Sequence, residues 1–162
     1  MKRSLMMTAC LATIMATASA AQTPSRGIEE DYYNWQSIKL DPAGGAAFFV
    51  TYAERAGNAV QFRMLAVYRD ERREGEVRYD KEMFTLLGDC GSRMLLTTGY
   101  RYQRGTEFIP PPIIAAPVAD VPSEVSIRGL ALAAVCRPDG APGEWTKTPY
   151  SWAKQRLREG RP

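Results

Sequence analysis

The sequence predicts an α+β protein, in which an antiparallel meander of about five to six strands carries a C-terminal helix packed on it and a second short helix at the end. Two observations predict this fold. Between residues 35 and 103, apolar residues recur at every second position in runs that short polar turns separate. After residue 122, the apolar spacing changes to that of an amphipathic helix.

The early strands follow the alternating runs in order. A first short strand is expected near 35–40, before a turn rich in Pro and Gly at 41–45. The next two are expected at 46–53 and 59–69, around a hairpin loop at 54–58. One face of the 59–69 run holds Val60, Phe62, Met64, Ala66 and Tyr68. Leu65 and Val67 interrupt the polarity of the other face.

The later strands alternate less evenly. A charged loop at 70–76 precedes an extended run at 76–87, whose alternation fails around Asp80 and Glu82 and so predicts a bulge or a break. The last long run covers 93–103. One side of this run is predicted to hold Met94, Leu96, Thr98, Tyr100 and Tyr102.

A proline-rich segment at 107–122 follows the sheet. Five prolines exclude a helix there and favour an extended strap. The simplest interpretation is a stiff connection between sheet and helix, and a peptide-like docking segment is the alternative.

Two helices are expected after the strap. The first covers 123–136, with Ser123 as its N-cap and Glu124 in its first turn. A short basic helix is expected to follow Pro149 and to end near Arg158.

The N-terminus has the pattern of a secretory signal peptide. Lys2 and Arg3 precede an uncharged stretch that ends in a small-x-small cleavage site at Ala18–Ala20. We expect a signal peptide at 1–20, a leader at 21–34, one domain at 35–137 and a C-terminal extension at 138–162. A buried N-terminal helix is one alternative, and lipidation at Cys10 is another, although too few apolar residues precede Cys10 for a lipoprotein signal.

Charge and cysteine content set further bounds. Loss of Lys2 and Arg3 with the signal peptide lowers the formal net charge of +3 by two, to +1, which does not indicate a nucleic-acid partner. Cleavage leaves Cys90 and Cys136. In an oxidising compartment these two are expected to form a disulfide, with two buried free thiols as the alternative.

No catalytic constellation is present in the sequence. The chain contains no histidine, which removes the Ser-His-Asp and Cys-His arrangements. No cysteine pair has metal-ligand spacing, and no phosphate-binding glycine motif occurs, so we expect no metal, cofactor or catalytic residue. Cys90 follows Asp89 in a Gly-rich turn, where a reactive thiol is the alternative to a half-cystine.

The acidic residues and the C-terminal aromatic residues are the remaining candidates for a functional site. The acids at 70–76 alternate with arginines and indicate a solvated hairpin tip. Asp80 and Glu82 lie two residues apart and are predicted to share a strand face, where a carboxylate pair is conceivable.

Trp145 and Trp152 lie among basic residues of the extension. This indicates either a packed helix with a solvated basic face or a contact with an anionic surface.

The spacing of several residues resembles the surface-adhesin protein E family of Gram-negative envelope proteins. Those residues are Asp89-Cys90 followed by Arg93, Pro122-Ser123-Glu124 and Val135-Cys136, within a matching stretch at 35–136. The resemblance implies a single antiparallel sheet with a C-terminal helix, tied by the two cysteines. It also implies an adhesin that binds host proteins and self-associates.

This chain departs from the family in two ways. It lacks a convincing lipobox, and it continues past Cys136. Only the two cysteines carry over as functional residues.

The sequence is therefore compatible with three functions. The first is an exported, non-enzymatic binding or adhesin-like module of the periplasm or outer surface, whose partners are envelope or extracellular proteins. A second copy of this chain is an alternative partner, in a homodimer. The second is an enzyme or enzyme inhibitor with a cleft between sheet and strap, whose polar groups include Arg63, Asp80 or Glu82. The third is a structural subunit that adds a partner strand to a sheet edge.

Overall fold

The computed structural model describes residues 33–109, 119–137 and 143–160. The expected signal peptide, nearly all of the leader and most of the proline-rich strap lie outside these ranges.

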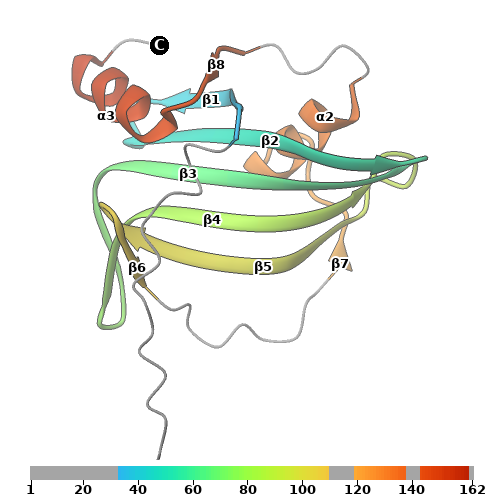
Figure 1. Ribbon diagram of the computed structural model, residues 1–162, viewed down its shortest axis with the longest axis horizontal. Coiled ribbons are helices and arrows are strands. Elements are labelled where there is room, and N and C mark those ends of the chain that lie inside the picture. Colours follow the sequence, from blue (N-terminus) through green and yellow to red (C-terminus); the bar gives the residue numbers. More distant parts are fainter. Residues whose placement is uncertain (1–32, 110–118, 138–142, 161–162) are drawn as a thin grey trace, which may run out of the picture.

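The described chain forms a sheet in the order β6-β5-β4-β3-β2-β1-β8, with β7 also paired to β5 (Figure 1). The strands are β1 Trp35–Asp41, β2 Ala46–Ala56, β3 Ala59–Glu74, β4 Val77–Asp89, β5 Leu95–Arg104, β6 Glu107–Ile109, β7 Ala119–Asp120 and β8 Trp145–Thr146. The helices are α2 Ile127–Cys136 and α3 Pro149–Glu159.

The predicted α+β fold is confirmed. The five expected strands form an antiparallel meander, β1 to β5. Strands β6, β7 and β8 were not predicted, because each has only two or three residues and shows no measurable alternation. The loops expected at 54–58 and 70–76 were too long. Strands run on to Ala56 and Glu74, and tight turns begin at Gly57 and Gly75, both with positive φ.

The two helices pack on opposite faces of the sheet. Val60, Phe62 and Met64 belong to the buried cluster that includes α2. Leu65 and Val67, which point the other way, belong to the cluster that includes α3. This explains why both faces of β3 are apolar in the sequence: each one is covered by a helix (Figure 1). The two sides are called the α2 face and the α3 face below.

Helix α2 begins later than predicted. Its N-cap is Ser126, whose Oγ accepts a 3.0 Å hydrogen bond from the backbone N–H of Gly129. Ser123 lies in the turn before the helix, and its carbonyl accepts the Ser126 N–H. Glu124 is therefore not in the first turn and contacts Arg93 instead. Helix α3 agrees well with the prediction, with Pro149 in its first turn.

A bulge in β5 changes which side chains share a face. The register shifts so that Leu96 pairs with Leu87, whereas Tyr100 pairs with Phe84, and Thr98 lies in the irregular step between them. Because an extra residue reverses the alternation, the prediction that Leu96 and Tyr100 lie on one side is wrong.

A disulfide joins the sheet to the end of α2. Cys90 follows β4, Cys136 is the last residue of α2, and their Cα atoms lie 5.6 Å apart. The pair that the sequence predicted is thus bonded in the structure, and it holds α2 against the end of the β4–β5 hairpin. Neither of the described helices has the length and apolar character needed to cross a membrane.

Candidate functional site

A cavity of about 320 Å³ opens on the α3 face of the sheet. Strands β2, β3 and β4 supply most of its wall. The lining residues are Tyr33, Thr51, Glu54, Gln61, Phe62, Arg63 and Thr85. Its volume lies in the lower range of small-molecule sites. Arg63 is thus the one residue of the predicted trio Arg63, Asp80 and Glu82 that lines it.

Cross-strand register places the central polar residues in one row. Arg63 in β3 lies opposite Thr51 of β2 and Thr85 of β4. The next position in the row is Gly99 of β5, where a Cβ would approach Oγ1 of Thr85 to 3.2 Å. Opposite residues in adjacent strands project from the same face. A guanidinium therefore lies between two hydroxyl-bearing residues. At the β5 end of the row the residue is Gly99, which has no side chain.

Among the described residues, no carboxylate pairs with the Arg63 guanidinium. Its Cζ lies 4.4 Å from the ring centroid of Tyr33, which is a cation–π contact. Its Nη1 is buried and has no hydrogen-bond partner in the described part of the chain. Glu54 is the one acid among the residues that line this cavity. An unpaired buried donor costs about 1–3 kcal/mol, and more when it is charged.

Arg63 can therefore accept an oxyanion from outside the fold. A guanidinium offers a planar fork of N–H donors that matches a carboxylate or phosphate. Thr51 and Thr85 add hydroxyls on either side, and each can donate to a second oxygen. The arrangement suits binding of an acidic group.

Asp80 and Glu82 lie on opposite faces of the sheet, so the prediction that they share one face is wrong. The β3–β4 register breaks between the pairs Val67–Lys81 and Arg72–Tyr79, and Asp80 occupies the step. The strand therefore does not alternate regularly from Asp80 to Glu82. The predicted bulge is present, and it is what separates the two carboxylates.

Asp80 is part of a buried link between β4 and α3. Its Oδ2 accepts a 2.7 Å hydrogen bond from the Tyr150 hydroxyl and lies 3.3 Å from Nζ of Lys154. Its Oδ1 accepts the backbone N–H of Gly105 at 3.1 Å. Nζ of Lys81 lies 4.6 Å from the Tyr150 ring centroid. Because these contacts within the described part of the chain engage both carboxylate oxygens, we give Asp80 a structural role.

Glu82 lies on the α2 face beside a row of five aromatic rings, which we call the tyrosine row. Neighbouring centroids in the row are 4.1–6.1 Å apart. The row consists of Phe84, Tyr100, Tyr102, Tyr79 and Tyr68 in that order. Tyr68 and Tyr79 donate hydrogen bonds to Glu82, and the Tyr102 hydroxyl donates to Glu74.

Burial raises the pKa values throughout this cluster. The pKa of the Glu82 carboxyl is raised by loss of solvent, partly offset by the hydrogen bonds from Tyr79 and Tyr68. Burial also raises the pKa of Tyr102, to about 12, and those of Tyr68, Tyr79 and Tyr100 further. The tyrosines therefore stay protonated and serve as hydrogen-bond donors at neutral pH.

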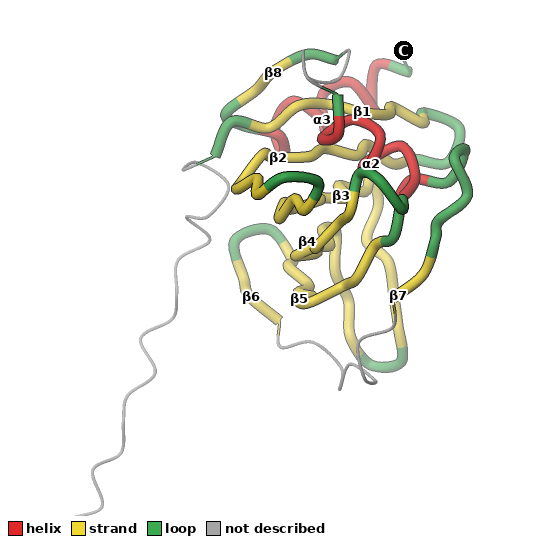
Figure 2. Tube along the Cα trace, turned by 90° about the vertical axis from the view of Figure 1, so that its right-hand side faces the viewer, coloured by secondary structure: helices red, strands yellow, loops and turns green. Residues whose placement is uncertain are grey.

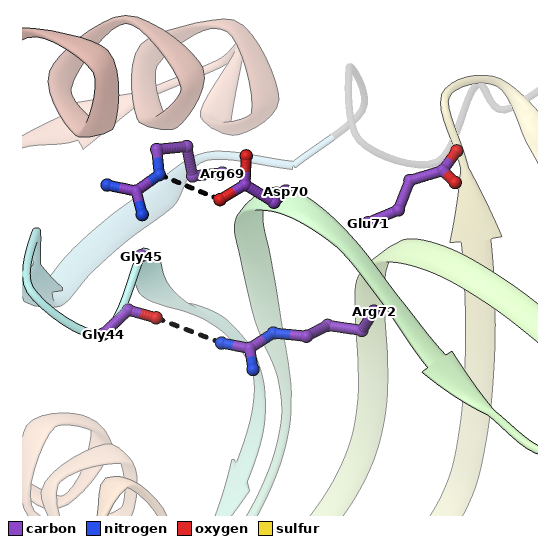
Figure 3. Close-up of a pocket in the computed structure, with 6 residues that line it drawn as sticks. All are labelled: Gly44, Gly45, Arg69, Asp70, Glu71 and Arg72. Atoms are coloured by element: carbon purple, nitrogen blue, oxygen red, sulfur yellow. Dashed lines mark hydrogen bonds and ion pairs between the residues drawn. The ribbon is translucent and has the colours of Figure 1, made fainter.

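A second cavity, of about 260 Å³, lies beside the turn between β1 and β2 (Figure 3). Arg69 pairs with Asp70 at 3.0 Å, and Nη2 of Arg72 donates to the Gly44 carbonyl at 3.0 Å. Arg69 also donates to the Pro42 carbonyl at 3.4 Å. Because these guanidinium groups are already engaged by the protein, we give this cavity a structural role.

The C-terminal extension is a packed element and not a free basic tail. Trp152 contacts Phe49 edge to face with centroids 5.4 Å apart, and Cζ of Arg156 lies 5.1 Å from the Trp152 ring centroid. One of the two predicted interpretations gave this helix a solvated basic face, but Lys154 of the helix pairs with Asp80 and its side chain is only 16% exposed. Trp145, in contrast, is 54% exposed on the short edge strand β8.

Sequence reasoning missed Tyr33, Thr51 and Thr85 as site residues. Thr51 and Thr85 could have been found by writing out the register of the two hairpins, since both fall opposite Arg63. Tyr33 precedes β1, and no local pattern places it over Arg63.

Comparisons with known proteins give no relative for this chain: no family model, no curated protein and no solved structure matches it. The resemblance to the surface-adhesin protein E family therefore stays a prediction.

Proposed function

We propose that this chain is an exported, non-enzymatic binding module of the cell envelope that holds an acidic group of its ligand in the Arg63 cavity. The observation that carries the proposal is the position of the Arg63 guanidinium. It lies over Tyr33, between the hydroxyl-bearing residues Thr51 and Thr85, and its Nη1 is buried without an acceptor in the described ranges.

Three further features support binding over catalysis. Glu54 is the single acid among the lining residues, whereas glycoside hydrolysis needs two facing carboxylates. Asp80 and Glu82, the acids that a cleft enzyme would have used, lie on opposite faces of the sheet and are hydrogen-bonded within the protein. The disulfide and the two covering helices make the sheet a rigid support for a site.

The export signal and the protein E resemblance support an envelope location, in the periplasm or on the outer surface. In that setting, the ligand is an acidic side chain or a C-terminal carboxylate of an envelope or extracellular protein. The proposal keeps the two cysteines as structural residues and assigns no residue a catalytic role.

The test is a ligand titration followed by NMR on the oxidised chain from residue 21 onward. Sodium acetate and sodium phosphate are added at constant ionic strength, with sodium chloride as the reference. We expect saturable shifts of the backbone amides of Thr51, Arg63 and Thr85. Arg63→Met should abolish the shifts, whereas Arg78→Met, which removes an exposed arginine of the β3–β4 hairpin, should leave them unchanged.

Arg63→Lys separates two explanations for binding. A lysine keeps the charge but loses the planar fork, so the affinity for acetate should fall by about fivefold or more. Equal shifts in the wild type and in Arg63→Met, or turnover of a chromogenic glycoside or ester by the wild type, would rule out the proposed function.

A further inference from the structure

The tyrosine row lies on the α2 face, away from the Arg63 cavity, and the function proposed above does not use it. Helix α2 makes its main contacts with β1, β2 and β3. The row instead crosses β4 and β5, toward the hairpin end of β3. Figure 2 shows the β3–β4 hairpin turned to the same side of the sheet as α2. The rings therefore lie beyond the strands that α2 mainly contacts, and the Tyr102 hydroxyl reaches Glu74 of the hairpin.

The row has a buried floor and an accessible rim. Tyr79 and Tyr102 are 7% and 1% exposed. Tyr68, Glu82 and Tyr100 are half-buried, so part of each side chain still meets solvent. Part of the row is therefore packed in the fold, while Tyr68, Glu82 and Tyr100 remain accessible to a partner.

The charges around the row are unbalanced. Glu74 and Glu82 lie close enough for the charge of Glu74 to raise the pKa of Glu82. Among the described residues, Arg72 is a cation whose charge acts on Glu82, and its Cζ lies 4.8 Å from the Tyr68 ring centroid. Two carboxylates and one guanidinium therefore lie beside these aromatic rings, and the guanidinium donates its hydrogen bond to the Gly44 carbonyl. Arg72 also shows directly that a guanidinium fits on the face of a ring in this row.

We propose that the tyrosine row and Glu82 form a binding site for a cationic side chain, the guanidinium of an arginine or the ammonium of a lysine on a partner protein. Aromatic faces attract such cations electrostatically, most strongly where water is excluded. The Glu82 carboxylate supplies the opposite charge, and its hydrogen bonds from Tyr68 and Tyr79 fix its position. The site is independent of the Arg63 cavity, which lies on the other face and takes the opposite charge.

The experiment is an NMR titration of the oxidised chain from residue 21 with Nα-acetyl-arginine amide, Nα-acetyl-lysine amide and the neutral isostere Nα-acetyl-citrulline amide. We expect saturable shifts at Tyr68, Glu82 and Tyr100 with one or both cations and none with citrulline. A higher affinity for the arginine amide would indicate a guanidinium site. A higher affinity for the lysine amide would indicate an ammonium site. Equal shifts with citrulline would overturn the proposal.

Variants locate the site and test the charge. Glu82→Gln should weaken cation binding by about fivefold or more, whereas Glu54→Gln, on the opposite face, should leave it unchanged. Arg72→Gln removes the internal competitor and should strengthen binding by about threefold or more. This gain cannot come from misfolding, so it keeps the test decisive even if Glu82→Gln is unstable. Unchanged or weaker binding in Arg72→Gln would contradict the proposal.

Discussion

The Tyr150 hydroxyl donates a 2.7 Å hydrogen bond to Oδ2 of Asp80, and this contact joins α3 to β4 across 70 residues of sequence. The same oxygen lies 3.3 Å from Nζ of Lys154, and the two side chains of that ion pair are only 16% and 8% exposed. Helix α3 is therefore attached to the sheet by a buried polar link as well as by its apolar contacts through Ala153 and Leu157.

Breaking this link should destabilise the fold strongly. Asp80→Asn leaves the Lys154 charge unpaired in a buried place, and we expect a loss of about 3 kcal/mol in the free energy of unfolding. Tyr150→Phe removes one hydrogen bond and should cost about 1 kcal/mol. Urea unfolding followed by circular dichroism measures both. Asp70→Asn, which breaks an ion pair whose acid is 76% exposed, is the control and should change stability by less than about 1 kcal/mol.

The disulfide should supply a large share of the stability. Cys90 and Cys136 are 46 residues apart, and closing a loop of this size restricts the unfolded chain by about 4 kcal/mol. We expect the double variant Cys90→Ala, Cys136→Ala to unfold at a much lower urea concentration than the oxidised wild type. Reduced wild type should match the variant. Coinciding curves for oxidised and reduced wild type would show that the bond does not stabilise this fold.

The N-cap of α2 can be tested with two serines. Ser126→Ala removes the acceptor for the Gly129 N–H and should lower the free energy of unfolding by about 1 kcal/mol. Ser123→Ala should have little effect, because its carbonyl, which accepts the Ser126 N–H and hydroxyl, is retained. The reverse ranking would place the start of the helix at Ser123.

Glu82 should make stability depend on pH in a specific direction. Burial raises its pKa in the folded state above the ordinary 4.5. The folded protein then holds this proton more tightly than the unfolded chain, so the stabilisation is complete below pH 4.5 and is lost as the pH rises through the folded pKa. Other carboxylates titrate in the same range, and comparison with a variant removes their contribution.

The measurement is the free energy of unfolding of the wild type minus that of Glu82→Gln, from pH 3.5 upward. This difference should fall as the pH rises above 4.5 and then level off. A difference that rises over this interval would mean that the carboxylate is stabilised in its charged form.

Export should be visible in the mass of the mature protein. We expect the intact chain to begin at Ala21, to carry no lipid, and to lack the two hydrogens that the disulfide removes. Expression in a Gram-negative host, followed by fractionation and intact-mass analysis, tests all three expectations together. An uncleaved cytoplasmic chain with two free thiols would contradict the envelope assignment.

Sequence alone determined the main strands, because two-residue alternation is a local property of an extended chain. The faces of β3 followed from this alternation, and the start of α3 followed from the proline at its first turn. The choice of Cys90 and Cys136 as partners followed from counting, since these are the cysteines that lie outside the predicted signal peptide.

Only the tertiary structure decided which side chains meet. The register breaks at Asp80 and Thr98 separate Asp80 from Glu82 and Leu96 from Tyr100. Their positions depend on packing against distant elements, such as α3 beneath Asp80. The Arg63 cavity likewise needs Tyr33, 30 positions away, to cover the guanidinium. Local periodicity carries no information about such pairings, because the free energy that selects them comes from contacts between segments far apart in the chain.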